Sequence, residues 1–168
     1  SKRDFMRVAV FGAGGFIGST FCELYKNELD IVRLASKDVP LGNKEVVTAA
    51  LKGVDAVVHA AFDHLYKDNI SGIQNIVDGC IKNGVKKIIY LSSVSVYDPD
   101  FVGVLDEGSP YSVINDPYSK EKRAVEKELD KMARGKINTV ILQPSIIYGL
   151  GGNWTKYAFH VAKAESVL

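Results

Sequence analysis

Tyr118 and Lys122 are two side chains whose types and spacing could carry proton transfer. They lie four positions apart in a segment expected to be helical, so they share one face and their polar ends can reach one site. A phenol is a poor base near pH 7, but a neighbouring positive charge stabilises its phenolate form. The pair is therefore a candidate acid/base for a proton that joins or leaves a substrate oxygen.

A hydroxyl that could orient the same oxygen comes from Ser92 or Ser93, directly after a predicted strand at residues 87–91. The Tyr-x-x-x-Lys spacing alone has little weight, because the chain contains 8 tyrosines and such pairs also arise by chance. The order of features along the chain is more informative. A glycine-rich turn comes first, then the strand that ends in two serines, an irregular stretch, and a helix that opens with Tyr118.

The glycine-rich turn, GAGGFIG at residues 12–18, joins a predicted strand at 6–11 to a predicted helix at 16–25. Residues without a Cβ let the backbone turn tightly and let a pyrophosphate approach the amides, while the helix N-terminus offers unpaired N–H groups. In this context the motif predicts a bound nicotinamide dinucleotide, whose ribose Lys122 would hold. The turn residues expected at this cofactor are Gly12, Gly15, Phe16, Ile17 and Gly18.

The second predicted strand, at residues 30–34, bears on the choice between NAD and NADP. A carboxylate at its end normally accepts the ribose hydroxyls of NAD, whereas an arginine suits the extra phosphate of NADP. Here Arg33, Ser36 and Lys37 suggest a phosphate pocket, which favours NADP. The alternative, that Asp38 reaches the ribose of NAD, stays open.

Short apolar runs alternate with longer amphipathic segments, which favours parallel strands joined by crossover helices. Further strands are expected at 56–59 and 139–142, and further helices at 46–51, 69–83 and 118–134. Residues 98–116 are rich in Gly, Pro, Asp and Ser, which predicts a long surface connection beside the site. We expect a dinucleotide-binding domain at 1–150, and at 151–168 the start of a substrate lobe that is truncated or largely missing.

The chain has 168 residues with 21 basic and 20 acidic side chains, so its net charge of +1 gives no reason to expect nucleic acid or an anionic membrane as partner. No stretch approaches the ~20 apolar residues of a membrane span. Cys22 and Cys80 lie in helical segments, where we expect buried hydrophobes rather than a disulfide or metal ligands. These features predict a cytoplasmic protein without a metal site.

Several motifs together resemble those of the extended short-chain dehydrogenase/reductases, the NAD(P)-dependent epimerase/dehydratase family. They are GAGGFIG, ALKGVDAVVHAA, YLSSVSVY, DPYSKEKRAVE and QPSIIYG. The resemblance implies an α/β Rossmann fold, a doubly wound parallel sheet in three α/β/α layers. It also implies that Ser93 rather than Ser92 orients the substrate, with Tyr118 as acid/base and Lys122 as its partner. Residues implied to line the dinucleotide are His59, Ala60, Ala61, Lys122, Pro144 and Ile147.

Three departures from the family pattern qualify this resemblance. Val94 and Ser95 stand where dehydratases carry an Asp-Glu pair, which disfavours dehydration. Gln143 stands where the family usually has Arg. Residues 37–48 are too few for a further strand, so either the sheet edge is reduced or residues are missing.

The function that follows is an NAD(P)-dependent epimerase or reductase that moves a hydride to or from a hydroxyl or ketone of a small molecule, expected to be a nucleotide sugar. The alternative is a non-catalytic dinucleotide-binding sensor or scaffold. By analogy with the family, a homodimer through the Tyr-Lys helix and its predecessor is possible.

Overall fold

The computed structural model describes residues 5–114 and 116–165. Strands and helices alternate along the chain, as the apolar pattern predicts. The strands are β1 (Arg7–Phe11), β2 (Asp30–Leu34), β3 (Ala56–His59), β4 (Lys87–Leu91) and β5 (Asn138–Leu142). The helices are α1 (Phe16–Tyr25), α2 (Lys44–Ala50), α3 (Asn69–Asn83), α4 (Pro117–Ala133) and α5 (Asn153–Glu165), with a 3-10 turn η1 (Val94–Val96) after β4. The first four residues of the expected dinucleotide-binding domain and the last three of the segment 151–168 lie outside the described residues.

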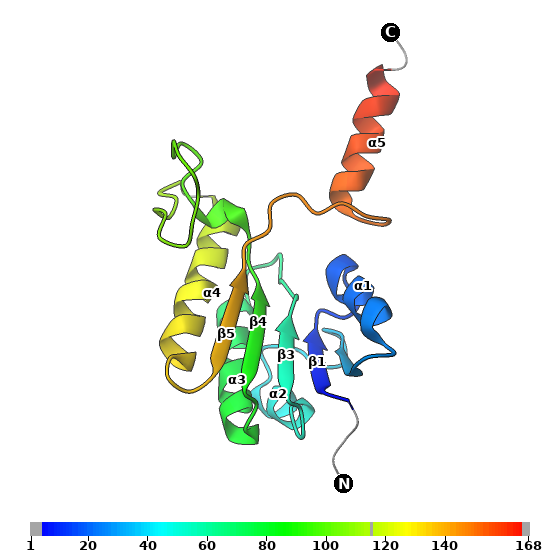
Figure 1. The fold of residues 1–168 in the computed structure, drawn as a ribbon, viewed down its shortest axis with the longest axis vertical. Helices are drawn as coiled ribbons and strands as arrows, with labels where there is room; N and C mark the ends of the chain where they lie inside the picture. The colour runs from blue at the N-terminus through cyan, green and yellow to red at the C-terminus, as the bar shows by residue number, and fades with distance from the viewer. Residues whose placement is uncertain (1–4, 115, 166–168) are drawn as a thin grey trace.

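The strands form one parallel sheet in the order β2-β1-β3-β4-β5. The chain runs from β1 out to β2 and then back across to β3, so the direction of winding reverses between β1 and β3. In open parallel sheets, ligands bind in the crevice outside the carboxyl ends of the strands at such a reversal. In Figure 1 the strand arrows point towards the end of the molecule from which α5 projects.

Alternate residues of the central strands enter two separate cores. Ala9, Phe11 and Val57 pack into the larger core together with residues of α2, α3 and α4. Val8 and Val10 pack into the smaller core, which includes residues of α1. Because successive strand residues point to opposite faces, the two cores lie on opposite sides of the sheet. The three-layer α/β/α architecture is confirmed.

The short stretch between β2 and α2 contains no strand. The chain passes from β2 through a turn into α2 without a further strand, so among the described residues β2 is an edge of the sheet. The helix begins at Lys44, two residues before its predicted start, because the Asn43 side chain accepts a hydrogen bond from Val46 N at 3.1 Å. The sheet of this chain therefore ends at β2 among the described residues.

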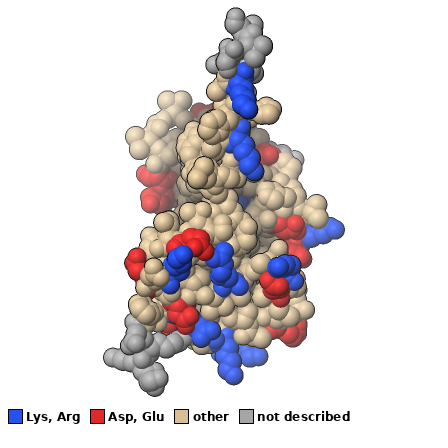
Figure 2. Space-filling view, turned by 90° about the vertical axis from the view of Figure 1, so that its right-hand side faces the viewer, with Lys and Arg blue, Asp and Glu red and all other residues tan. Residues whose placement is uncertain are grey.

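The charged side chains, the cysteines and the helix lengths are those of an ordinary globular protein. On the face shown in Figure 2, basic and acidic side chains are interspersed. Both cysteines are buried and free. In the described part of the chain, no helix combines the length and apolarity needed to cross a bilayer.

Candidate active site

A cleft of about 750 Å³ opens where the carboxyl ends of β1, β3, β4 and β5 meet the start of α4. The sequence-predicted residues that line it are Gly15, Phe16, Ile17, Ala60, Ser93, Tyr118, Lys122, Pro144 and Ile147. The structure adds side chains that sequence reasoning did not single out, among them Phe62, His64 and Trp154. The cleft therefore joins the glycine turn (residues 12–18) to the predicted serine, tyrosine and lysine residues.

The glycine turn is held by close backbone packing. Gly12 has a φ of +81°, and a Cβ on it would lie 2.6 Å from Ala61 N. A Cβ on Gly18 would lie 2.2 Å from the Gly12 carbonyl oxygen. No side chain fits at these distances, so these two glycines let the turn pack against the segment after β3 and against α1. The Ala61 backbone thus packs directly against Gly12 of the turn.

The N-terminus of α1 is open towards the cleft. Its N-cap residue, Gly15, has no side chain to cap the first-turn amides, and the first turn carries no acidic residue. The unpaired N–H groups and the positive end of the helix dipole are suited to an anion. The turn therefore fits the pyrophosphate of a dinucleotide.

The predicted phosphate pocket is only partly assembled. The Arg33 guanidinium lies beside the glycine turn, where it contacts Glu23 Oε1 at 3.1 Å and donates a hydrogen bond to Ala13 O at 3.4 Å. Ser36 and Lys37 are exposed and do not line the cleft. Arg33 alone is thus brought to the turn, and the structure leaves the choice between NAD and NADP open.

Tyr118 lies half-buried in the first turn of α4. The helix starts here because Pro117 occupies its first position and Asp116 caps it, accepting a hydrogen bond from Ser119 N at 2.8 Å. Burial raises the pKa of Tyr118 above its usual value, while a hydrogen bond from Ser93 lowers it in part. Burial therefore sets the direction of the shift, and the acidification by Lys122 that the sequence predicted is not among its causes.

Lys122 lies one turn further along α4 and is only 4% exposed. Its Nζ donates a hydrogen bond to Leu91 O at 2.8 Å and lies 4.7 Å from the centre of the Phe62 ring. Burial lowers the pKa of Lys122 to about 8, against an opposing effect of Glu126. An ammonium held in this way faces the same cleft as Tyr118 and Ser93. These three residues are called the Ser-Tyr-Lys cluster below.

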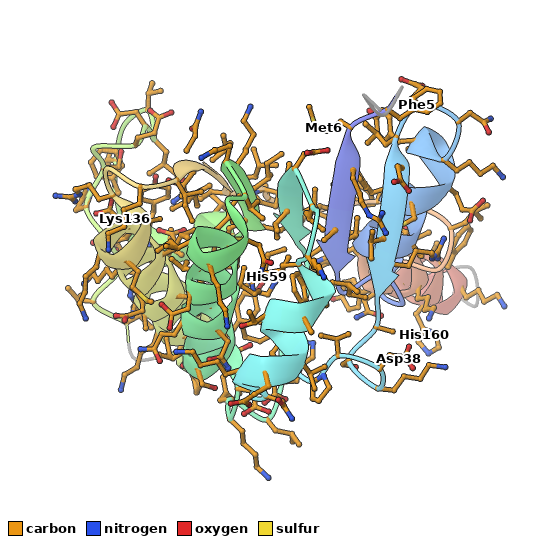
Figure 3. The ribbon with its side chains drawn as sticks, turned by 90° about the horizontal axis from the view of Figure 1, so that it is seen from below. Phe5, Met6, Asp38, His59, Lys136 and His160 are labelled. Atoms are coloured by element: carbon orange, nitrogen blue, oxygen red, sulfur yellow. The ribbon has the colours of Figure 1, made fainter. Side chains whose placement is uncertain are left out.

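His59 lies at the end of β3, where it is buried, and its label stands near the middle of the view in Figure 3. Its ring stacks on Tyr90 with centroids 5.3 Å apart and meets the Phe11 ring edge-on. Burial, and then the charge of Lys122, lower the pKa of His59 to about 3. The imidazole is therefore neutral, and it packs between aromatic rings instead of lining the cleft.

Comparison with known proteins gives the family. Residues 8–164 match the family described as the NAD dependent epimerase/dehydratase family. The chain belongs to this family. It is 30% identical to the N-acetyl-alpha-D-glucosaminyl-diphospho-ditrans,octacis-undecaprenol 4-epimerase of Escherichia coli O157:H7, over 84% of this chain and 49% of that protein. It is also 26% identical to the 2-alkyl-3-oxoalkanoate reductase of Stenotrophomonas maltophilia, over 87% of this chain and 52% of the reductase.

Solved structures agree on the fold of this epimerase/dehydratase-family chain. The dTDP-4-dehydrorhamnose reductase of Bacillus anthracis, solved with NADP, superposes with a TM-score of 0.83 at 23% identity, covering 98% of this chain and 62% of that one. The UDP-glucose 4-epimerase of Thermus thermophilus, solved with NAD, gives 0.69 at 24% identity, over 82% and 54%. The chain spans about half the length of the curated relatives just named.

Gln143 takes part in a hydrogen-bond network around the buried carboxylate of Glu126. Gln143 donates to Glu126 Oε1 at 3.0 Å and accepts from the Tyr97 hydroxyl at 2.7 Å. Tyr111 donates to the other oxygen of Glu126 at 3.0 Å. Glu126 is only 2% exposed, so these neutral donors satisfy a buried carboxylate.

Phe62 and Trp154 reach the site through the path of the chain. Phe62 follows Ala61 directly, and its ring meets the Tyr118 ring edge-on with centroids 5.0 Å apart. Its position three residues after β3 could have predicted that it lies at the cleft, because β3 ends there. Trp154 is the second residue of α5, far along the sequence, and only the folded chain brings it to the cleft.

Proposed function

We propose that the protein is an NAD(P)-dependent epimerase or reductase that transfers a hydride to or from a hydroxyl or ketone carbon of a nucleotide-sugar-like substrate. One observation carries this proposal: Ser93, Tyr118 and Lys122 face the same cleft as the open N-terminus of α1. The sugar-linked substrates in the names of the epimerases and the dehydrorhamnose reductase support the substrate class.

The roles of the chain's residues follow from their chemistry. A bound nicotinamide dinucleotide would supply the hydride donor or acceptor. Tyr118 Oη moves the proton at the substrate oxygen, and the Ser93 hydroxyl orients that oxygen. Lys122, charged below about pH 8, stabilises the phenolate and holds the nicotinamide ribose. Phe62 shields this pair from water.

The cofactor proposal favours NADP through Arg33, with NAD as the alternative. Titration of the purified chain with NADH and NADPH in parallel, followed by cofactor fluorescence, compares the two. Arg33→Ala should weaken NADPH binding about tenfold or more and leave NADH binding nearly unchanged, because only the extra phosphate needs the charge. Equal losses for both cofactors would contradict this pocket.

Turnover tests the catalytic proposal. The panel is UDP-glucose with NAD and dTDP-4-dehydrorhamnose with NADPH, followed by cofactor absorbance and product analysis. Tyr118→Phe should lower turnover about a hundredfold or more, because proton transfer loses its donor, while cofactor affinity and melting temperature stay close to wild type.

Cofactor binding without turnover in the full-length protein would favour the non-catalytic sensor or scaffold instead. A turnover that survives Tyr118→Phe unchanged would remove this tyrosine from the mechanism. The cytoplasmic location and a homodimer through α3 and α4 stay predictions.

A further inference from the structure

Ser95 is a polar residue of the cleft that the proposed mechanism leaves unused. It lies half-buried in η1, two residues beyond Ser93, and lines the same cleft as Tyr118. Its backbone N–H donates to Ser93 Oγ at 3.2 Å, and its hydroxyl donates to the same oxygen at 3.0 Å. Ser93 Oγ therefore accepts two hydrogen bonds from one residue.

This pairing determines what the Ser93 hydroxyl can do. A serine hydroxyl has one proton to donate and two lone pairs to accept with. Ser95 occupies both acceptor positions, so the remaining capacity of Ser93 is its proton. Ser93 lines the same cleft as Tyr118 and lowers the pKa of the phenol, the effect of a hydroxyl that donates its proton towards the phenol oxygen.

The phenolate form of Tyr118 makes this direction obligatory. A phenolate has no proton to offer, so it can only accept from Ser93, and Ser93 can do so best when its own lone pairs are filled. Hydrogen bonds to a charged oxygen are stronger than those to a neutral one. The chain Ser95 to Ser93 to Tyr118 thus favours the ionised phenol.

We infer that Ser95 is a positioning residue that, before substrate binds, orients the Ser93 proton towards Tyr118 and so stabilises the Tyr118 phenolate. When substrate is bound, the same proton turns to the substrate oxygen that Ser93 orients. The inference rests on the proposed function, because it assigns Tyr118 as the acid/base.

The local backbone makes the hydroxyl of Ser95 separable from the turn. The turn is closed by Val96 N donating to Ser93 O at 3.2 Å, and Val94 N is bonded to Pro144 O at 3.0 Å. Neither bond involves the Ser95 hydroxyl. Ser95→Ala therefore removes one hydrogen bond to Ser93 and leaves the backbone donor in place.

Other groups around Tyr118 also act on its ionisation and must stay constant in the test. Lys122 lies one helical turn away, Asp116 caps the same helix, and Tyr66 comes from the segment after β3. His64 packs on Phe62, which touches Tyr118. Substitution at Ser95 changes none of these.

The experiment is a titration of the Tyr118 phenol itself. A fluorinated tyrosine placed at position 118 titrates at lower pH than tyrosine, and its fluorine NMR signal reports the charge of the phenol. Ser95→Ala should move the midpoint to higher pH by about one unit, a tenfold change in ionisation constant. Ser95→Cys, a weaker donor, should fall between, and Ser95→Thr should restore the wild-type midpoint.

Ser92→Ala is the matched control. Ser92 is a buried serine beside Ser93, and its Oγ has no hydrogen-bond partner among the described residues. It should leave the midpoint unchanged. An unchanged midpoint in Ser95→Ala, or a folded Ser95→Thr that behaves like Ser95→Ala, would overturn the inference. The titration needs no substrate, so its outcome is separate from that of the Tyr118→Phe turnover test.

Discussion

The glycine turn and the Ser-Tyr-Lys cluster border the same cleft but are held in place in different ways. In the glycine turn, backbone packs on backbone, and the space that a Cβ would need is filled by the Ala61 and Gly12 main chain. In the cluster, side chains hold one another through hydrogen bonds and ring contacts around Lys122.

This difference decides what each side of the cleft tolerates. A steric site fails when an atom is added, whatever the pH. A site built on a buried charge tolerates changes of shape better, but it depends on the protonation of Lys122. The cofactor side should therefore respond to added volume, and the chemical side to charge.

The largest expected effect comes from Gly12→Ala. The φ of +81° and the 2.6 Å approach to Ala61 N both oppose a Cβ, so we expect a loss of unfolding free energy of about 3 kcal/mol or more and loss of dinucleotide binding. Gly14→Ala is the matched control in the same turn, because a Cβ there meets nothing within 4 Å and its φ is ordinary. It should cost less than about 1 kcal/mol.

Chemical denaturation and NADH titration of both variants make this measurement. If Gly12→Ala and Gly14→Ala were equally stable, the turn would not be held by packing, and the contrast between the two sides of the cleft would fail.

The second prediction concerns the charge of Lys122 in the folded chain. Burial lowers the pKa of Lys122 to about 8, whereas a lysine in an unfolded chain titrates near ~10.4. Between these values the unfolded chain holds a proton that the folded chain has released, so folding becomes more favourable as the pH rises. The unfolding free energy of wild type relative to Lys122→Met should rise by up to about 3 kcal/mol over this window.

Below about pH 8 both states are protonated and the difference should be flat. Denaturation curves at a series of pH values give the measurement. Gly12→Ala provides the comparison, since it adds no titratable group and its deficit should not change with pH. A flat difference for Lys122→Met as well would mean that Lys122 is not desolvated in solution.

The parts of the molecule that were predicted from the sequence are those set by short-range patterns. The strands β2, β3 and β4 have the predicted bounds because apolar runs of this length between turn residues leave little choice. Helix α3 ends where predicted because Gly84 takes a left-handed conformation at its C-cap. The glycine turn was also predicted from a short-range pattern. Gly12 and Gly18 leave no room for a side chain, and Gly15 leaves the first amides of α1 uncapped.

The parts that were not predicted depend on distant segments. The pKa direction of Tyr118 reversed because burial of the phenol depends on Phe62 and the rest of the cleft wall, which spacing in α4 does not contain. His59 was expected to line the dinucleotide but does not line the cleft, because β3 is the central strand and Tyr90 of the next strand stacks on the His59 ring. The turn η1 was missed because it is defined by Ser93 and by backbone bonds to the segment after β5.

The smallest expected effect concerns Glu126, which lies beside the Ser-Tyr-Lys cluster. This buried carboxylate raises the pKa of Lys122 and accepts hydrogen bonds from Tyr111 and Gln143. Tyr111→Phe removes one of these bonds without changing packing. Because Tyr111 is 40% exposed and water can replace part of the bond, we expect a loss of about 1 kcal/mol in unfolding free energy.

Tyr148→Phe is the control, since this tyrosine is 67% exposed and its change should be close to zero. A double-mutant cycle with Glu126→Gln assigns the effect to the carboxylate, because the cost of Tyr111→Phe should shrink when the acceptor is neutral. Equal costs in both backgrounds would show that Tyr111 stabilises its loop instead of Glu126. In that case the effect of Glu126 on the pKa of Lys122 would not depend on Tyr111. The charge on the chemical side of the cleft would then be set by the residues of α4 alone, without the loop that carries Tyr111.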